Sequence, residues 1–498
     1  MADTDDDPVI PDPTYLGNVR NFFRPVDIEH MAQKHIDIGT YDGVKQNALD
    51  IFFQTQPPSP HMPPPGFGPQ WSDNRSQTFK NWIANGFPLG TAIPDIPETP
   101  ATAGTRLRKN VASISADEQE KIKAAFSGLM GRDASAPDSY YTIAGGHGLP
   151  KSWCMHHVNP FNPWHRAYLK NFEDALRTVP DCEDVTLPYW DINTDLPQLL
   201  QADPLATYTL PADPGLGIAH YKTSRFPVDV IASNMRETGG SGFSVLQDLA
   251  TAQAQSVWGV DGLNGYQNWS IQAHDGGHGS IGPTMGNQDV ASYDPVFWFY
   301  HCNIDRMWLA WQTKLSATTL TGFKSVLGPG VDASWLSAPF NALTGLTATS
   351  DQTIGGCGIS YDNLAEDTTE ESAPALENKF GSVEAASRFA INGSDPVSVR
   401  VKDIARLNIP GSFAVHLLAD GEPIAKRFVF QRGNPQACDT CKERPLVNLD
   451  FRIDREKLVD RKLSVEIEVP SQTDAGTRFP LSEAGNPTVN ARLLLEDA

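Results

Sequence analysis

Several features that mark other protein classes are missing from this 498-residue sequence. No apolar run approaches the roughly 20 residues that a transmembrane helix needs, so no membrane-spanning segment is expected. The N-terminus, MADTDDDPVIPDPTY, is acidic and contains several prolines, without the basic and apolar regions of a signal peptide. We therefore expect a cytoplasmic location by default, with export alongside a partner protein as the alternative.

Basic residues and cysteines are also scarce. The chain has 39 Lys and Arg against 60 Asp and Glu, which gives a formal net charge of −21. This charge disfavours nucleic acid or an anionic membrane as a general partner. Six cysteines are too few to form a disulfide framework in a chain of this length. This composition fits a soluble enzyme that acts on small molecules, without identifying them.

Composition and periodicity divide the chain into four parts. The predicted parts are a helical and proline-rich N-terminal extension (1–105), a mainly helical domain (106–363), an acidic linker (364–379) and a C-terminal β domain (380–498). The last part is predicted to be β because apolar residues alternate with polar ones, as at Val397, Val399 and Val401. Asp420-Gly421 separates two such runs and predicts a hairpin, which indicates an antiparallel sandwich.

Histidines provide the clearest chemical signal. Two groups have the spacing of metal ligands: His147, His156 and His165, followed by His274, His278 and His301. The HxxxH pair in the second group places two imidazoles on one helical face. Three imidazoles suit copper, zinc, iron or nickel, but two such groups without a carboxylate ligand favour a pair of copper ions. A pair of zinc sites, or a set of hydrogen-bonded core histidines, is the alternative.

The residues around these histidines resemble the type 3 copper superfamily of tyrosinases, catechol oxidases and haemocyanins. The matching segments are RKNVASIS (108–115), AGGHG (144–148), CMHHVNPFNPWHRAYLKNFE (154–173), LPYWD (187–191), HDGGH (274–278) and DPVFWFYHCNIDRMW (294–308). The resemblance implies a mainly α, four-helix-bundle domain around two copper ions, followed by the antiparallel β-sandwich domain. The first three histidines would bind one copper ion, and the second three the other.

The resemblance also selects between two adjacent histidines. The family's second ligand stands nine residues before the histidine of the PWHR motif, which selects His156 over His157. His157 would then lie behind the ligands or at the surface. Cys154 occupies the position where fungal and plant members form a thioether with the ligand histidine. The resemblance therefore implies a Cys154–His156 bond, with a small buried thiol as the alternative.

Three further residues are candidate catalytic residues. Asp275 stands where many monophenol-hydroxylating members carry an asparagine that orients a water, and a carboxylate can accept the proton as well. Residues 261–273 contain no obvious match to the glutamate that often assists this asparagine. Phe297 lies where the family places an aromatic ring over the copper pair. Asp305 follows His301 by four residues, a position from which it could hydrogen-bond a ligand imidazole.

The C-terminal domain contains a CxxC motif at Cys438 and Cys441. Such a pair can be a redox couple, half a zinc site or a soft Cu(I) site. The segment resembles the β domain of latent fungal tyrosinases, in which a CxxC is implicated in copper delivery; incidental thiols or a local disulfide are the alternative. That β domain also inserts a bulky side chain into the copper site. Phe428 and Phe430 are the candidate plugs here, with core packing as the alternative, and the linker is the expected protease target.

Together these features predict a copper enzyme that oxidises phenols and o-diphenols to o-quinones with O2, as a tyrosinase held in a latent form. A catechol oxidase without monophenol hydroxylation is the alternative within the same class. A haemocyanin-like O2 carrier is the alternative from a different class. The expected partners are a small phenol and O2, without nucleic acid or membrane.

Overall fold

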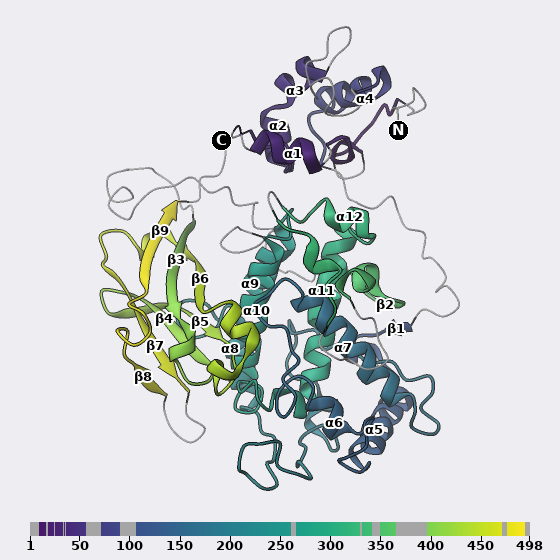
Figure 1. Ribbon diagram of the computed structural model, residues 1–498, viewed down its shortest axis with the longest axis vertical. Coiled ribbons are helices and arrows are strands. Elements are labelled where there is room, and N and C mark those ends of the chain that lie inside the picture. Colours follow the sequence, from purple (N-terminus) through teal and green to yellow (C-terminus); the bar gives the residue numbers. More distant parts are fainter. Residues whose placement is uncertain are drawn as a thin grey trace.

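The computed structural model has three parts, which Figure 1 shows as N-terminal helices, a helical centre and C-terminal sheets. It describes residues 9–15, 18–23, 25–32, 34, 36–55, 71–89, 106–259, 265–328, 331–340, 349–364, 396–470 and 476–493. The predicted acidic linker lies outside these residues, except for its first position. Among the described helices, none combines the length and the apolar character that a membrane crossing requires.

The N-terminal part consists of short helices. They are η1 (Val19–Phe22), α1 (Pro25–Ala32), α2 (Tyr41–Gln46), α3 (Ala48–Thr55) and α4 (Asp73–Ala84). Helix α4 begins where the side chain of Ser72 accepts a hydrogen bond from the backbone N–H of Arg75. Aromatic side chains of this part share an apolar cluster with Trp258 and Trp311 of the helical centre. The N-terminal part therefore packs onto the helical centre through aromatic rings.

The helical centre runs from residue 106 to residue 364. Its elements are β1 (Arg106–Arg108), η2 (Val111–Ser113), α5 (Ala116–Met130), α6 (Tyr140–Ala144), α7 (Phe161–Leu176), η3 (Gln198–Gln201), α8 (Val228–Arg236), α9 (Val245–Ala254), α10 (Tyr266–Ile281), η4 (Ala291–Tyr293), α11 (Val296–Lys314), α12 (Leu320–Lys324), η5 (Ser334–Leu336), η6 (Ser350–Gly356) and β2 (Ile359–Tyr361). Helix α11 contacts α7, and α10 contacts α8, α9 and the C-terminal part.

Local sequence explains how two of these helices form. Helix α5 begins with a capping box, because Ser115 accepts from the N–H of Glu118 while the Glu118 side chain accepts from the N–H of Ser115. Helix α11 is apolar on most of its circumference, and all its residues from Val296 to Gln312 are buried. A helix of this kind belongs inside a protein, surrounded by other elements. Helix α11 thus forms the central support of the domain.

The C-terminal part consists of two antiparallel sheets. Its elements are β3 (Pro396–Ala405), η7 (Arg406–Asn408), β4 (Phe413–Ala419), β5 (Glu422–Val429), η8 (Pro435–Ala437), α14 (Asp439–Glu443), β6 (Leu446–Asp454), η9 (Arg455–Lys457), β7 (Leu463–Val469), β8 (Thr477–Phe479) and β9 (Thr488–Leu493). The strand orders are β6-β3-β9 and β5-β4-β7-β8. Apolar side chains of both sheets form one common core. The prediction of a helical core followed by antiparallel β structure is confirmed at this level.

The predicted hairpin is present between β4 and β5. Asp420 and Gly421 form its turn with φ values of 53° and 85°. Two successive left-handed residues are typical of the tight turn whose twist matches that of the flanking strands. The turn leaves β5 at the edge of its sheet, where it contacts α10 of the helical centre (Figure 1).

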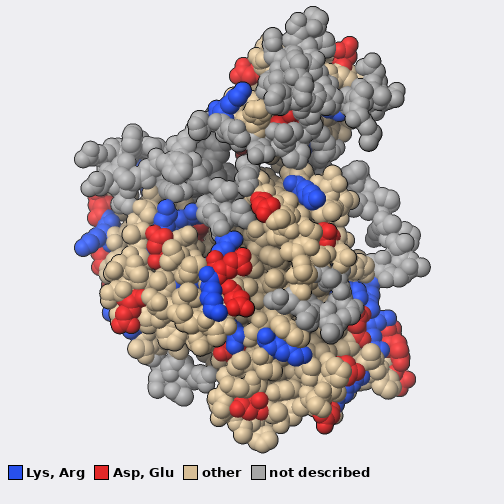
Figure 2. Space-filling model, in the orientation of Figure 1, with Lys and Arg blue, Asp and Glu red and all other residues tan. Residues whose placement is uncertain are grey.

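Charged side chains on the surface are mixed rather than separated by sign. On the face drawn in Figure 2, blue and red residues alternate over both the helical and the C-terminal parts, with wide uncharged areas between them. Among the described residues on that face, no large patch carries a single sign.

Candidate metal centre

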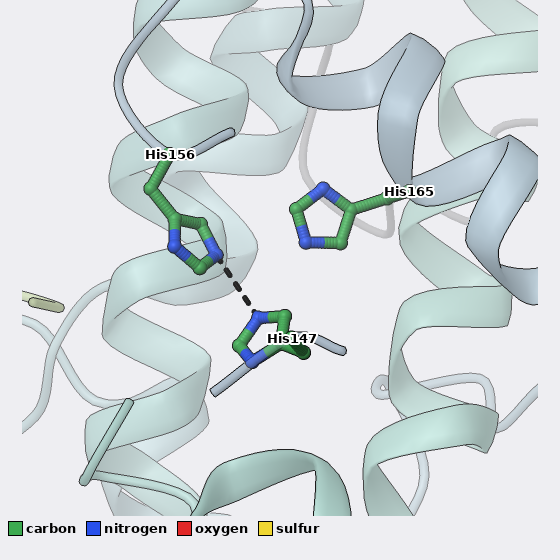
Figure 3. Close-up of side chains that lie close together, drawn as sticks. All are labelled: His147, His156 and His165. Atoms are coloured by element: carbon green, nitrogen blue, oxygen red, sulfur yellow. Dashed lines mark hydrogen bonds between the residues drawn. The ribbon is translucent and has the colours of Figure 1, made fainter. Parts of the chain in front are cut away.

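Six buried histidine side chains meet in the middle of the helical centre. His147 follows α6, His156 lies in the loop before α7, His165 lies on α7, His274 and His278 lie on α10, and His301 lies on α11. Each side chain is at most 4% exposed. Figure 3 shows the first three pointing toward one another, with Nε2 of His147 3.2 Å from Nε2 of His156. The loop and helix positions inferred from the sequence therefore converge in space.

The histidines form two groups that adjoin each other. The ligand atoms of His147, His156 and His165 all lie within 4.8 Å of one another, and so do those of His165, His274 and His301. His278 joins the second group, because its Nε2 lies 3.0 Å from Nε2 of His301. The rings of His165 and His301 are stacked at 4.7 Å and link the two groups. The arrangement offers enough nitrogen donors for two neighbouring metal ions.

Hydrogen bonds orient three of these imidazoles. Each uses Nδ1–H as a donor: His165 to the carbonyl of Phe161 at 2.7 Å, His278 to the carbonyl of Met285 at 2.7 Å and His274 to Oδ1 of Asp275 at 2.9 Å. A donor at Nδ1 leaves the lone pair on Nε2, which is the usual arrangement behind a metal-binding histidine. These rings are therefore held in the tautomer that a metal ion requires.

The electrostatics of the cluster favour neutral imidazoles. Burial is the largest cause that lowers the pKa of all six histidines, and it lowers the pKa of His165 to about 3. For most of them, the nearby histidines are the second cause and lower the pKa further. Five buried ring nitrogens have no partner among the described residues, one each on His147, His156, His165, His274 and His301. Unpaired buried nitrogens are costly unless something binds them. Neutral, unpaired imidazoles are the donors that copper and zinc accept, so the cluster fits two such ions.

Two phenylalanine rings enclose the cluster from different parts of the chain. Phe297 of α11 lies 4.7 Å from the ring of His147 and 4.1 Å from that of His301. Phe430, which directly follows β5, stacks on His278 at 3.8 Å with 17° between the ring planes. Phe428 contacts Gly279 instead and lies outside the cluster. Of the two candidate plugs, Phe430 is therefore the one at the histidines.

Asp275 lies beside the cluster and accepts three hydrogen bonds. Its Oδ1 accepts from His274, and its Oδ2 accepts from Nε2 of His157 at 2.7 Å and from the backbone N–H of Phe430 at 3.0 Å. Burial acts to raise the pKa of Asp275, but the interactions with His157 and His274 outweigh it and lower the pKa. The Asp275 carboxylate is therefore ionised, and both of its oxygens accept hydrogen bonds while the C-terminal part is in place.

The expectation that Asp305 hydrogen-bonds a ligand imidazole is wrong. Its Oδ1 accepts from Nε of Arg166 at 2.6 Å, and its Oδ2 accepts from the hydroxyl of Tyr361 at 2.5 Å. Arg108 lies 3.4 Å from the same carboxylate. Helical spacing places Asp305 near His301, but these partners, which are distant in sequence, take both carboxylate oxygens. Asp305 instead braces α11 against α7 and β2.

The cysteines named from the sequence lie in two separate places. The thiol of Cys154 is buried, 2.8 Å from Nε2 of Gln288, and burial raises its pKa to about 12. The thioether with His156 stays a prediction. Cys438 and Cys441 are joined in a disulfide at the start of α14. The local disulfide is therefore the form that the structure adopts, and copper delivery stays a prediction.

Charged pairs that sequence reasoning missed hold the C-terminal part against the helical centre. Nη2 of Arg427 lies 2.7 Å from Oδ1 of Asp248, and both side chains are at most 2% exposed. Arg432 forms a second pair with Asp289. These partners are 179 and 143 residues apart in the chain, so no local pattern could have indicated them.

The central part of the chain is similar to known proteins. Residues 137–314 match a family model described as the common central domain of tyrosinase. The chain is 28% identical over 226 residues to the haemocyanin β-C chain unit G of Helix pomatia, covering 43% of the chain and 53% of that protein. It is 25% identical over 313 residues to a tyrosinase of Neurospora crassa, covering 44% of the chain and 45% of that protein. The chain thus spans about half the length of these relatives.

A solved structure extends the similarity to the fold. The tyrosinase from Burkholderia thailandensis superposes with a TM-score of 0.57 at 20% identity, covering 78% of this chain and 100% of that chain. This likeness concerns the fold alone. The segment that matches the family model, residues 137–314, contains all six clustered histidines.

Proposed function

We propose that the chain is a type 3 copper protein that oxidises phenols and o-diphenols to o-quinones with O2 at two copper ions, since residues 137–314 match the central domain of tyrosinase. The observation that carries this proposal is the pair of adjoining groups of neutral, buried imidazoles. His147, His156 and His165 would hold one ion, and His274, His278 and His301 the other. Bound copper supplies the electron exchange between the phenol and O2.

The protein's own residues prepare the site for this chemistry. The Nδ1–H donors keep Nε2 of His165, His274 and His278 available for the metal. Phe297 lines the site and helps to exclude water. The stacking of Phe430 on His278 indicates that a flat ring fits there, so a phenol would take the same place once Phe430 leaves. Asp275 would hold a water that accepts the phenol's proton.

The C-terminal sheets act in this proposal as a shield. Phe430 occupies the position proposed for the phenol ring, so a phenol cannot bind until that ring is displaced. The buried pairs of Arg427 with Asp248 and of Arg432 with Asp289 support a stable closed form. We expect cleavage within the linker 364–379 to release the shield and start turnover.

One assay tests the proposal against its alternatives. The full chain is loaded with copper, and quinone formation from L-tyrosine and from L-DOPA is followed before and after limited proteolysis. Quinone from both substrates, rising several-fold after cleavage, supports a latent tyrosinase. Quinone from L-DOPA alone supports a catechol oxidase, and an O2-dependent absorption band without turnover supports a carrier. Activity that stays unchanged after clean release of the C-terminal part argues against a shield.

A carrier remains the second candidate because of two observations. The relatives include the haemocyanin unit of Helix pomatia. Phe430 also covers the histidine cluster, and a covered site admits a molecule as small as O2 more easily than a phenol. If the shield never leaves, the same geometry serves reversible O2 binding. The proteolysis arm of the assay therefore decides between the two functions.

A further inference from the structure

His157 connects the proposed catalytic carboxylate to the shield. Its Nε2 lies 2.7 Å from Oδ2 of Asp275, and its Nδ1 lies 2.6 Å from Nη1 of Arg406 in the C-terminal part. The His157 side chain is 13% exposed, and Arg406 is buried. The imidazole therefore sits between a carboxylate of the helical centre and a guanidinium of the shield.

The guanidinium decides which ring nitrogen carries the proton. Arginine can only donate hydrogen bonds, so Nδ1 of His157 must be the acceptor toward Arg406. The proton of the neutral ring then lies on Nε2, from which it is donated to Asp275. The contact between His157 and Asp275 is therefore a hydrogen bond with Nε2–H as the donor and Oδ2 as the acceptor.

The backbone at His157 is strained to bring the ring to this place. Its φ is 58°, in the left-handed region that residues other than glycine enter at a cost of about 1 kcal/mol. The preceding residue, His156, belongs to the metal cluster. The left-handed turn thus sends two successive imidazoles in different directions, one to the metal site and one to Asp275.

The shield also blocks the carboxylate oxygen that His157 holds. Oδ2 of Asp275 accepts from both His157 and the backbone N–H of Phe430. When the shield leaves, the Phe430 N–H leaves with it, and Oδ2 keeps only the bond from His157. The freed lone pair points toward the former position of the Phe430 backbone N–H. The ring of that same residue stacks on His278, where the phenol is proposed to bind.

We propose that His157 is a positioning residue for Asp275: its Nε2–H donor holds the carboxylate so that, without the shield, Oδ2 faces the bound phenol. This proposal rests on the proposed function. While the shield is closed, Arg406 keeps the proton of the His157 ring on Nε2, so that this nitrogen can donate to Asp275. Misplacing a catalytic group by about 1 Å can cost about 100-fold in rate, so the orientation of one carboxylate can determine hydroxylation.

The kinetic test compares two substitutions that both place a side chain other than glycine at the left-handed position. His157→Phe keeps a flat ring but removes the donor, whereas His157→Gln keeps an N–H donor at a similar reach. Each copper-loaded full chain is cut in the linker, and kcat/KM is measured for L-tyrosine and for L-DOPA. We expect His157→Phe to lower the ratio of the two values about tenfold, and His157→Gln to stay within about threefold of the parent.

Two results would overturn the positioning role. One is a parent-like ratio in His157→Phe, and the other is an equal fall in both variants. Copper content and melting temperature are measured alongside. A merely structural role would lower kcat/KM for both substrates together and release copper. A parent protein that oxidises neither substrate after cleavage would instead overturn the proposed function.

A second measurement does not depend on activity or copper. In the metal-free, uncut full chain with ¹⁵N-labelled histidine, the NMR signal lost in His157→Gln identifies the His157 ring. We expect that signal to show a neutral ring protonated on Nε2, with its Nε2–H shifted by Asp275→Asn. A proton on Nδ1, or no response to Asp275→Asn, would overturn the proposal even if the chain oxidises phenols.

Discussion

The histidine cluster is buried, and so is the interface between the helical centre and the C-terminal sheets, here called the seam. The two regions contain different kinds of polar group. The cluster contains neutral imidazoles, and five of its ring nitrogens have no partner among the described residues. The seam contains charged pairs with close partners, such as Arg427 with Asp248. Unpaired donor nitrogens are concentrated in the cluster, as in a site that binds a ligand, whereas Arg427 and Arg432 of the seam each have a carboxylate partner. The histidine cluster, with its unpaired nitrogens, is thus covered by an interface that ion pairs hold together.

The largest expected effect comes from removing a metal ligand. His278→Ala should lower phenol oxidation by more than about a thousandfold, because one copper ion loses a nitrogen donor that no nearby group replaces. Copper content should fall from two ions per chain toward one, as measured by elemental analysis. His220→Ala, at an exposed histidine outside the cluster, is the matched control and should keep both ions. Two bound ions in His278→Ala would contradict the ligand assignment.

The next effect separates the two phenylalanines. Phe430→Ala in the uncut chain should raise L-DOPA oxidation roughly tenfold, since the ring that stacks on His278 is gone while the shield stays bound. Phe428→Ala is the matched control, because Phe428 packs against Gly279 outside the cluster. It should lower the unfolding free energy by about 3–5 kcal/mol and loosen the shield, so its activation should be accompanied by faster linker cleavage, whereas Phe430→Ala should activate without faster cleavage. Equal activation by both variants would remove the special role of Phe430.

A smaller effect is expected from the paired charges of the seam. Burial raises the pKa of Asp248 to about 7, and Arg427→Met removes the cation that opposes this rise. The buried ion pair is then lost, which should cost the closed form about 3–5 kcal/mol. The uncut variant should therefore be cleaved faster and be more active before cleavage. The double variant Arg427→Met/Asp248→Leu removes both charges and should recover most of the closed state. If the double variant is as open as the single one, the pair is not what holds the seam.

The smallest effect concerns the scaffold beneath both regions. Ser115→Ala removes half of the α5 capping box and should lower the unfolding free energy by about 1 kcal/mol, with no change in latency. The hydrogen bond from Lys109, followed by that from the Ser115 backbone, lowers the pKa of Glu118 to about 2. Its contribution is therefore present above pH 4.5 and is lost as the pH falls toward 2. An unfolding free energy at neutral pH that is identical in Ser115→Ala and the parent would exclude the Ser115 side chain as a source of stability.

Local sequence determined those features whose physical cause is local. The capping box of Ser115 and Glu118 and the Asp420-Gly421 turn follow from the bonding of neighbouring residues. The six histidines could be named because their flanking motifs resemble a known family, and because His274 and His278 share a helical face. The period-two pattern likewise indicated the C-terminal β structure.

Only the tertiary structure decided which groups meet across the chain. Asp305 was expected near His301, but Arg166 and Tyr361 take its oxygens from positions 139 and 56 residues away. The choice of Phe430 over Phe428 depends on how the end of β5 meets α10, because both rings have the same alternation in sequence. His157 meets Asp275 and Arg406 across 118 and 249 residues. Burial and packing select such partners, and no local periodicity records them.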